Sequence, residues 1–332
     1  MKKSFIFISF LFGLFLISSC KTPPVEQQKI SINQQLYSTN SIEDFSNKKI
    51  KIYFPSFMIY DASQKTERMV WGDGMVIILP DEKVMMIDSF DSEGQEQLID
   101  FLKDLSITKI DYFFSTHNHM DHIGGVPAIL DTFPVDHYYW NGAHFDSAID
   151  QLTTQKLEEK QIETTILKQG DSLILCEEPL CKIDVLWPHL SEKDIYNIFY
   201  KPGRTAKMKN NSSLVLKLTY GDFSVLFTGD LYKQGENELV KTYGSELKST
   251  ILKSPHHGEF YTANGKNFIK TVSPEVTIIQ DSIYVVLPIS NKVINKLYSD
   301  INSKLLYRYS EGYILITSNG CEYSVKESSF TK

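Results

Sequence analysis

The amino-acid sequence predicts an α/β fold, a four-layer αββα sandwich formed by one domain. Apolar runs of strand length alternate with stretches in which apolar residues recur at helical spacing. This alternation occurs twice, so a first half of strands and helices is followed by a second half of the same kind. Three of the apolar runs lead directly into histidine or aspartate, which predicts that polar, chemically active side chains gather at strand ends.

In the first half, glycine, asparagine and aspartate turns separate the apolar runs. Strands are expected at residues 50–60, 72–80, 84–87, 110–114 and 135–139. Helices are expected at residues 92–105, from Gly125 to about residue 132, and at residues 147–161. The helix at 92–105 follows from apolar residues at helical spacing. The helix at 147–161 carries many charges and is expected to lie at the surface.

The second half begins near residue 173 and is again rich in apolar runs of strand length. Strands are expected at residues 173–175, 183–186, 214–218, 223–227, 250–253, 276–279, 305–307 and 313–316. Helices are expected at residues 236–241 and 291–298. Because these elements again alternate, the second half predicts a second sheet covered by helices.

The N-terminus is typical of an export signal rather than of a folded element. A basic start is followed by an apolar stretch at residues 5–17, which is short for a membrane-spanning helix, and by Ile-Ser-Ser-Cys ending at Cys20. The last four residues resemble a bacterial lipoprotein box, so we expect residues 1–19 to be a signal peptide and Cys20 to carry lipid. Residues 20–49 then form a polar tether. The expected location is the bacterial cell envelope, outside the cytoplasm and anchored to a membrane; an uncleaved anchor or a cytoplasmic segment is the alternative.

The charge and the cysteines limit the possible functions. The chain has 34 basic and 41 acidic residues, a net charge of −7, which argues against broad charge-driven binding of nucleic acid but allows a local basic patch. Cys176 and Cys181 flank Glu-Glu-Pro-Leu, and an exported location would permit a disulfide between them or leave both free. The cysteines lack zinc-finger spacing.

Residues 113–125 hold the densest group of candidate metal ligands. His117, His119, Asp121 and His122 place four ligands within six residues, directly after the apolar run at 110–114. Imidazole and carboxylate together suit zinc, iron or manganese. Because alternate residues of an extended segment point in opposite directions, such a loop can face two metal ions. The alternative is a solvated loop that happens to be rich in histidine.

Two later strand ends add further candidate ligands. Asp230 follows the apolar strand 223–227 after Thr-Gly, and the pair His256–His257 follows Ser-Pro after the strand 250–253. The alternative is that the aspartate is a turn residue and that the two histidines are surface residues. We favour His257 as a metal ligand and His256 as a group that either faces the substrate or supports a ligand from behind, although the sequence does not decide between them.

The order His-x-His-x-Asp-His followed by Gly-Gly resembles the signature of the metallo-β-lactamase fold hydrolases. The resemblance implies that residues 50–332 form such a hydrolase domain, with two divalent metal ions, zinc being expected and manganese the alternative. It implies that Asp230 bridges the two ions. The complete set of implied metal ligands is His117, His119, Asp121, His122, Asp230 and His257. Asp121 and His256 are the expected catalytic residues, and a water activated by the ions is the expected nucleophile.

One ligand that this fold usually supplies is missing. It should fall in Asn-Asn-Ser-Ser-Leu-Val-Leu at residues 210–216, which contains no histidine, while His144 and His189 come too early in the chain. This stretch instead resembles the hydrolase domain of the DNA-uptake competence channel protein and its stand-alone relatives, and the choline-phosphate esterases share the His-rich motif. We therefore expect Asn211 and Ser212 to bind substrate. The chain departs from the competence group by carrying His119 where aspartate is frequent, which puts nuclease activity in doubt.

A basic run precedes this stretch and bears on the substrate. It comprises Lys201, Arg204, Lys207 and Lys209. Cations on a loop beside the metals could hold phosphate oxygens, so we expect Lys201 and Arg204 to bind a small-molecule or nucleic-acid phosphoester. The alternative is a solvated loop. Two other functions remain open at this point: hydrolysis of a lactam, lactone or other ester, and a non-catalytic metal-binding scaffold. The sequence allows no protein partner to be inferred.

Overall fold

The computed structural model describes residues 48–63, 65–145, 147–178, 180–189, 206–280, 288–307 and 310–330. The expected signal peptide, Cys20 and nearly all of the tether lie outside these residues, as do Lys201 and Arg204. The described chain folds into two large sheets and a separate hairpin. Among its described helices, none combines the length and the apolar character that crossing a membrane requires.

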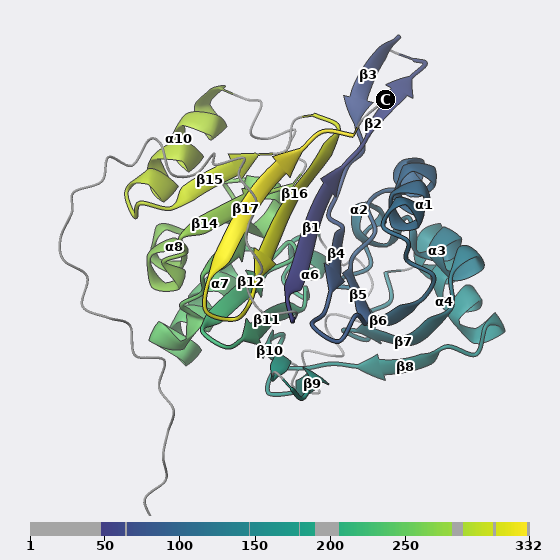
Figure 1. Cartoon of the computed structure of the whole chain (residues 1–332). Coiled ribbons are helices and arrows are strands. Elements are labelled where there is room, and N and C mark those ends of the chain that lie inside the picture. The colour runs from purple at the N-terminus through teal and green to yellow at the C-terminus, as the bar shows by residue number, and fades with distance from the viewer. Residues whose placement is uncertain are drawn as a thin grey trace, which may run out of the picture. The chain divides into compact units, whose positions relative to one another are not determined.

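The first sheet has eight strands in the order β17-β16-β1-β4-β5-β6-β7-β8. Their bounds are β17 Tyr323–Ser328, β16 Gly312–Ser318, β1 Ile50–Ser56, β4 Met75–Ile78, β5 Val84–Ile87, β6 Ile110–Phe114, β7 Val135–Trp140 and β8 Glu163–Ile166. Strands β5 to β8 run parallel to one another, so their carboxyl ends share one edge of the sheet. The antiparallel pairing of β1 with β16 places the end of the chain beside its first strand (Figure 1).

The second sheet has seven strands in the order β15-β14-β13-β12-β11-β10-β9. Their bounds are β15 Lys304–Tyr307, β14 Val276–Ile279, β13 Ile251–Lys253, β12 Phe223–Phe227, β11 Val215–Tyr220, β10 Cys181–Trp187 and β9 Ser172–Cys176. Strands β12 to β15 are parallel, whereas β9 to β12 form an antiparallel meander. Cys176 and Cys181 are partners across β9 and β10, and both carry free thiols.

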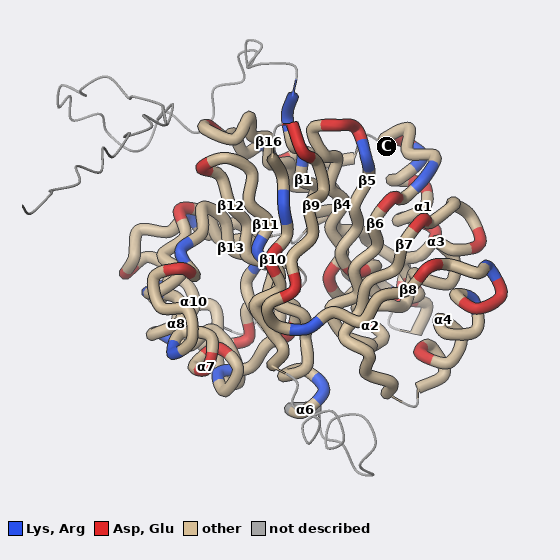
Figure 2. The backbone as a smooth tube through the Cα atoms, turned by 90° about the horizontal axis from the view of Figure 1, so that it is seen from below, with Lys and Arg blue, Asp and Glu red and all other residues tan. Residues whose placement is uncertain are grey.

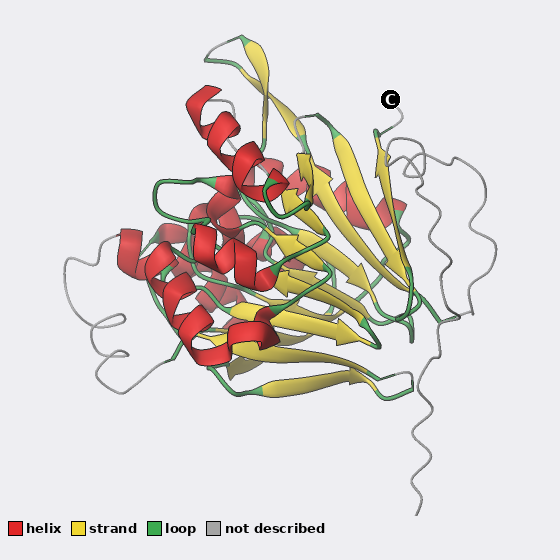
Figure 3. Cartoon of the chain, turned by 90° about the vertical axis from the view of Figure 1, so that its left-hand side faces the viewer, coloured by secondary structure: helices red, strands yellow, loops and turns green. Residues whose placement is uncertain are grey.

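Helices cover the outer face of each sheet. Over the first sheet lie α1 Gln95–Asp104, α3 Val126–Thr132 and α4 Ala148–Glu159, with the short turns η1 Ser92–Gly94 and α2 Met120–Ile123 (Figure 1). Over the second lie α7 Lys233–Tyr243, α8 Lys266–Val272 and α10 Pro288–Ser299, with η3 Gly244–Leu247 (Figures 1 and 3). Two further short turns, α6 Ala206–Asn210 and η4 Pro255–Gly258, follow or precede strands of the second sheet.

Three apolar clusters hold these four layers together. The central cluster joins the inner faces of the two sheets, where the rings of Phe54 and Phe227 stack with centroids 6.4 Å apart. The second packs α1, α3 and α4 onto the first sheet, and the third packs α7, α8 and α10 onto the second. Each fully buried phenylalanine or leucine contributes on the order of 2 kcal/mol through removal of apolar surface from water. The predicted αββα sandwich is confirmed.

Some predicted elements differ from the structure. The strand expected at 50–60 ends at Ser56, and β2 Met58–Asp61 pairs with β3 Thr66–Met69 in a hairpin that extends away from the sheets (Figures 1 and 3). The helix expected at the surface is half buried, because Ile149 and Leu157 pack onto the first sheet and Asp150 is 2% exposed. Strands β8 and β17 and helix α8 were not predicted.

Candidate metal centre

The candidate ligands come together at the carboxyl ends of parallel strands from both sheets. Strand β6 leads into His117–His122, β12 leads into Asp230, and β13 leads into His257. Since β6 belongs to the first sheet and the other two strands belong to the second, the centre forms where the two sheets meet. Parallel strands present their ends at one edge, which brings together residues separated by more than a hundred positions.

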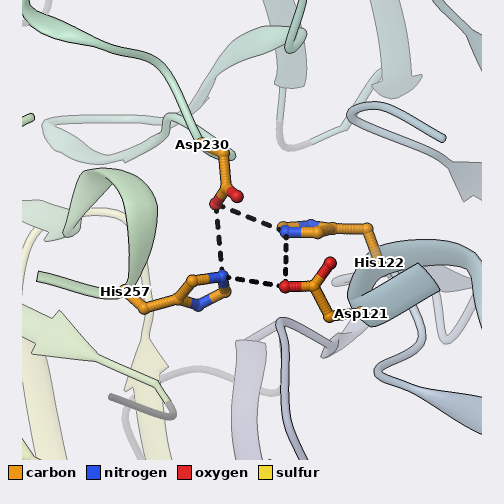
Figure 4. Close-up of side chains that lie close together, drawn as sticks. All are labelled: Asp121, His122, Asp230 and His257. Atoms are coloured by element: carbon orange, nitrogen blue, oxygen red, sulfur yellow. Dashed lines mark ion pairs between the residues drawn. The ribbon is translucent and has the colours of Figure 1, made fainter. Parts of the chain in front are cut away.

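One group of donors consists of Asp121, His122, Asp230 and His257, whose side chains point toward a common centre (Figure 4). Their ligand atoms lie within 4.8 Å of one another. Nε2 of His122 is 3.3 Å from Oδ1 of Asp230, and Nε2 of His257 is 3.4 Å from the same oxygen. Nε2 of His257 is also 3.4 Å from Oδ2 of Asp121. Two imidazoles and two carboxylates form a four-donor set of the kind that zinc and similar ions accept.

A second group consists of His117, His119 and Asp230. Nε2 of His117 lies 2.9 Å from Nδ1 of His119 and 3.8 Å from Oδ2 of Asp230. Two nitrogen atoms that both carry lone pairs at this separation repel each other unless a proton or a cation lies between them. Within the described residues, this group has three donors where the first has four.

Asp230 belongs to both groups and turns one oxygen toward each. Its Oδ1 faces His122 and His257, and its Oδ2 faces His117. The side chain is 3% exposed, so its charge is not screened by water. This arrangement is that of a carboxylate able to bridge two cations.

Buried atoms without hydrogen bonds show that the group fits a metal ion. Nε2 of His122, Oδ1 of Asp230 and Nε2 of His257 are all buried and have no hydrogen-bond partner in the structure. Buried polar atoms normally find such partners, because leaving them unpaired costs about 1–3 kcal/mol each. Three such atoms converging from two sheets fit a divalent cation that binds all three.

Asp88 holds His122 from behind. Its Oδ2 lies 2.8 Å from Nδ1 of His122, and its two oxygens accept hydrogen bonds from the backbone N–H and the hydroxyl of Thr116, both at 2.7 Å. A carboxylate on Nδ1 keeps the proton there and leaves Nε2 with its lone pair toward a metal. The same pattern that predicted Asp230, a strand ending in aspartate, would have identified Asp88 at the end of β5.

Asp73 takes the corresponding position behind His257. Its Oδ1 lies 3.1 Å from Nδ1 of His257, and its Oδ2 lies 2.6 Å from Nζ of Lys253. Neither Asp73 nor Lys253 was predicted to serve the centre. The available sequence signal was an aspartate between two glycines, Gly72 and Gly74, immediately before a strand.

Backbone conformation fixes both histidines of the pair. His256 and His257 adopt left-handed conformations, with φ of 46° and 51°, which are unfavourable for residues other than glycine and cost about 1–3 kcal/mol each. The turn points His257 into the four-donor group. His256 instead places Nε2 3.9 Å from Oδ2 of Asp230 and Nδ1 3.1 Å from the hydroxyl of Thr262. The structure thus brings both histidines to Asp230, with His257 in a donor group and His256 beside it.

The pKa values separate the histidines into two classes. Burial lowers the pKa of His117 well below its ordinary value and that of His119 to about 4, so both are neutral and able to bind a cation. Burial also disfavours charge on His122 and His257, but Asp230 and the carboxylates behind them raise both pKa values well above the ordinary value. Without a metal, His122 and His257 of the four-donor group are therefore protonated, and their protons take the place of a cation.

The segment that lacks the expected histidine lies directly beside the motif. Leu214 donates its N–H to the carbonyl of Thr116 at 2.9 Å, and the Ser213 hydroxyl lies 3.4 Å from Nδ1 of His117. The Asn211 side chain accepts from the N–H of Tyr232, and the Ser212 hydroxyl donates to the Lys209 carbonyl. These bonds tie the segment to α6 and α7, and substrate binding by Asn211 and Ser212 stays a prediction.

The two other histidines considered from the sequence belong to neither donor group. His189 is exposed just after β10. His144 is 51% exposed and places Nδ1 3.4 Å from Asp150. Asp150 in turn accepts a hydrogen bond from Asn118, which lies between His117 and His119. His144 therefore lies beside a residue that supports the ligand loop.

A family model described as the metallo-beta-lactamase superfamily matches residues 71–265. The chain belongs to this superfamily. The matched residues include every donor of both groups. Membership of the metallo-beta-lactamase superfamily confirms the resemblance and agrees with a metal-dependent hydrolase that has a two-metal centre.

Two relatives cover a large part of the chain. ComE operon protein 3 of Bacillus subtilis (strain 168) is 28% identical over 228 residues, which are 66% of this chain and 27% of that protein. Uncharacterized protein YcaI of Escherichia coli (strain K12) is 36% identical over 185 residues, which are 54% of this chain and 19% of that protein. The chain therefore spans a minor part of the length of either relative.

Solved structures of the superfamily are more distant. A diiron beta-hydroxylase, CmlA of Streptomyces venezuelae, aligns with a TM-score of 0.47 at 12% identity, over 80% of this chain and 54% of that one. A diphosphatase of the PhnP family aligns with a TM-score of 0.44 at 11% identity, over 80% of this chain and 96% of that one.

Proposed function

We propose that this superfamily member is an exported, lipid-anchored hydrolase that cleaves phosphoesters, with phosphodiesters as its leading substrates. The observation that carries the proposal is the asymmetry of the centre. The group of His117, His119 and Asp230 offers three donors, while the other group offers four. A divalent ion held by three donors has a coordination position left for a substrate oxygen.

The proposed cofactors are two divalent metal ions. The donors are imidazole nitrogens and carboxylate oxygens without thiolate, which suits zinc and also manganese. When bound, such ions supply a water of lowered pKa as nucleophile and polarise the phosphoryl oxygen.

The exposure of the donor side chains supports a proposed place for the reaction. Asp121 is 32% exposed, against 0% for His122, 3% for Asp230 and 7% for His257, so the four-donor group opens toward solvent at Asp121. We assign Asp121 the task of orienting the attacking water. His256 is 13% exposed and faces Asp230 from the side of the three-donor group, which supports our assignment of His256 to contact with a substrate oxygen bound there.

The position of Lys209 is evidence for a negatively charged substrate. Its ammonium lies 4.8 Å from the ring centroid of Phe145, and that ring lies 5.3 Å from the ring of His119. No carboxylate of the described residues forms an ion pair with Lys209, which lies on α6, where Figure 2 shows basic positions. An ammonium beside the three-donor group that forms no ion pair with a described carboxylate favours a substrate that carries negative charge there, as a phosphodiester does and an uncharged lactone does not.

The location is proposed from the sequence and the relatives. The Ile-Ser-Ser-Cys sequence at Cys20 supports lipid attachment, and the tether after it would place the hydrolase near a membrane surface. One further relative is Competence protein ComA of Neisseria gonorrhoeae, 37% identical over 81 residues. Because this relative is named a competence protein, single-stranded DNA belongs among the phosphodiesters to be tested.

The proposal is tested by assaying the purified, metal-loaded protein on three substrates in parallel: bis-p-nitrophenyl phosphate, single-stranded DNA and nitrocefin. Hydrolysis of a phosphodiester that is lost in Asp121→Ala and His119→Ala, with two metal ions bound by the wild type, is the expected result. Hydrolysis of nitrocefin alone would replace the phosphoester by a lactam. Metal binding without turnover of any substrate would identify a scaffold.

A matched pair of lysine variants tests the anionic substrate. Lys209→Met is expected to raise KM for bis-p-nitrophenyl phosphate by about 10-fold, the loss of one charge-assisted contact, with a smaller effect on kcat. Lys241→Met removes an exposed lysine of α7 and should leave both constants unchanged. An unchanged KM in Lys209→Met would remove Lys209 from substrate binding.

A further inference from the structure

Lys253 is the only buried cation among the described lysine and arginine side chains. It is the last residue of β13, and both its side chain and that of Asp73 are 0% exposed. Burying two charges costs several kcal/mol per ion, so a pair of this kind persists only where close geometry and further contacts compensate. The separation of 2.6 Å between Nζ and Oδ2, and the hydrogen bond from Nζ to the Ser254 carbonyl at 3.1 Å, meet that requirement.

The ion pair joins the two halves of the fold at the metal centre. Lys253 comes from the second sheet, and Asp73 lies in the loop that enters β4 of the first sheet. A second contact also joins the two halves. The side-chain amide of Gln280, after β14, donates to the carbonyl of Gly74 at 2.9 Å. The loop 72–74 is therefore held by two residues of the opposite half.

The same loop contacts one ligand from each half. Asp73 donates its N–H to the carbonyl of Asp121 at 3.1 Å, and its carboxylate lies 3.1 Å from Nδ1 of His257. Gly72, with φ of 106°, passes so close that an added Cβ would lie 1.7 Å from the Asp121 carbonyl. Any displacement of Asp73 would thus shift the ligand from the first sheet and the ligand from the second relative to each other.

Lys253 also balances part of the negative charge at the centre. Asp73, Asp88, Asp121 and Asp230 bring four carboxylates to the centre, and Lys253 is the fixed positive charge among them. Without it, the carboxylate of Asp73 would be buried with only the histidines His257 and His122 as neighbouring groups that can carry positive charge among the described residues. The lysine therefore holds Asp73 in place as a carboxylate, 3.1 Å from Nδ1 of His257. A negative charge at that distance favours a proton on Nδ1, which leaves Nε2 for a cation.

We propose that Lys253 is a positioning residue of the metal centre, acting through Asp73 to align His257 with Asp121 and so to set the affinity of the four-donor group for its divalent cation. The proposal rests on the two-metal centre of the proposed function. It predicts an unequal effect: the four-donor group should lose the most affinity, while the group of His117, His119 and Asp230 should change only through the Asp230 carboxylate that both groups share.

The test measures zinc affinities of the whole protein by competition with a chromogenic chelator, together with the visible absorption of bound Co²⁺. Lys253→Met should weaken one of the two zinc-binding steps by about 10- to 100-fold and change the Co²⁺ spectrum of that site. Lys217→Met is the matched control, because Lys217 is a partly buried lysine of β11 whose Nζ donates only to the carbonyls of Glu246 and Lys248 among the described residues. It should leave both steps unchanged.

Asp73→Leu/Lys253→Met keeps the proposal testable if the single variant does not fold. Replacing both partners by apolar side chains leaves no unpaired buried charge, so the double variant should fold, yet His257 still loses its support. The same 10- to 100-fold weakening of one step is expected. Wild-type affinity for both ions, in Lys253→Met or in the double variant, would overturn the proposal. A wild-type protein that binds fewer than two ions would instead overturn the two-metal centre itself.

Discussion

Asp88 and His122 form a hydrogen bond of 2.8 Å between two side chains that are both 0% exposed. The bond crosses from the end of β5 to the ligand loop after β6, and its carboxylate also accepts both hydrogen bonds of Thr116. His122 therefore cannot rotate without breaking its bond to Asp88, and two hydrogen bonds from Thr116 fix Asp88 itself. Asp88, which belongs to neither of the two donor groups described above, thus fixes the orientation of a candidate ligand. Its effect on metal affinity can be measured.

Asp88→Asn should keep the fold but weaken the centre. Asp88 has φ of 57°, a left-handed conformation that asparagine also tolerates, and an amide oxygen can still accept the N–H of Thr116. The amide NH2, however, cannot accept from Nδ1 of His122, so the imidazole proton moves to Nε2 and blocks the metal. We expect zinc affinity to fall by about 10- to 100-fold in chelator competition, with unchanged circular dichroism. Unaltered affinity would show that His122 needs no support from Asp88.

Asp230→Asn should affect both metal ions at once, because each oxygen faces a different donor group. We expect metal analysis to find less than one ion per chain and activity to fall by more than the ~100-fold typical of supporting residues. Asp222→Asn, in the exposed turn before β12, is the control and should behave as the wild type. Full retention of one ion by Asp230→Asn would show that Asp230 serves a single site.

Two glycines of similar backbone conformation should differ in their tolerance of alanine. Gly72 has φ of 106° and a space filled by the Asp121 carbonyl, whereas Gly170 has φ of 94° with no atom within 4 Å of an added Cβ. Gly170→Ala should lose about 1 kcal/mol of unfolding free energy from backbone strain alone. Gly72→Ala should lose at least about 3 kcal/mol, since a clash with backbone adds to the strain. Equal losses in urea denaturation would refute the close approach of Gly72 to Asp121.

Glu236 should make the stability of the fold depend on pH. It is fully buried on α7, accepts the N–H groups of Asn264 and Gly265 at the start of α8, and burial raises its pKa from 4.5 to about 7. Because the folded pKa is the higher one, its contribution is fully present below pH 4.5 and is lost as pH rises through about 7. The loss amounts to on the order of 3 kcal/mol.

Glu236→Gln provides the comparison, because glutamine cannot titrate. With EDTA present in both samples, the difference in unfolding free energy between wild type and Glu236→Gln should shift in favour of the variant between pH 5 and pH 8. Metal removal keeps the histidine ligands equal in the two proteins. Parallel stability curves would mean that Glu236 titrates at its ordinary pKa.

The local sequence predicted that the candidate ligands lie at strand ends, but it did not predict the residues that contact them. His117 to His122, Asp230 and His257 follow apolar runs, so strand recognition alone places them at strand ends. Lys253 and Asp73 are 180 positions apart, and nothing in either neighbourhood reveals that they meet. That contact depends on the packing of one sheet against the other, which sequence patterns do not specify.

The sequence also did not predict strands in which polar and apolar residues do not alternate clearly. Strand β17 has polar and charged residues on most positions and owes its place to pairing with β16, and β8 likewise lies at the edge of its sheet. Asp150 was taken for a surface charge, but the structure buries it as the acceptor of hydrogen bonds from Asn118 and Phe145. The distinct roles of His256 and His257 depend on their left-handed backbone, which the sequence does not show.

Because one carboxylate serves both donor groups, the two ions cannot bind independently. The first ion to arrive would fix the rotamer of Asp230 and displace the protons that its neighbours hold, and the second would then find an ordered ligand already in place. Thermodynamic linkage requires the coupling to be mutual, so each ion would raise or lower the affinity of the other by the same factor.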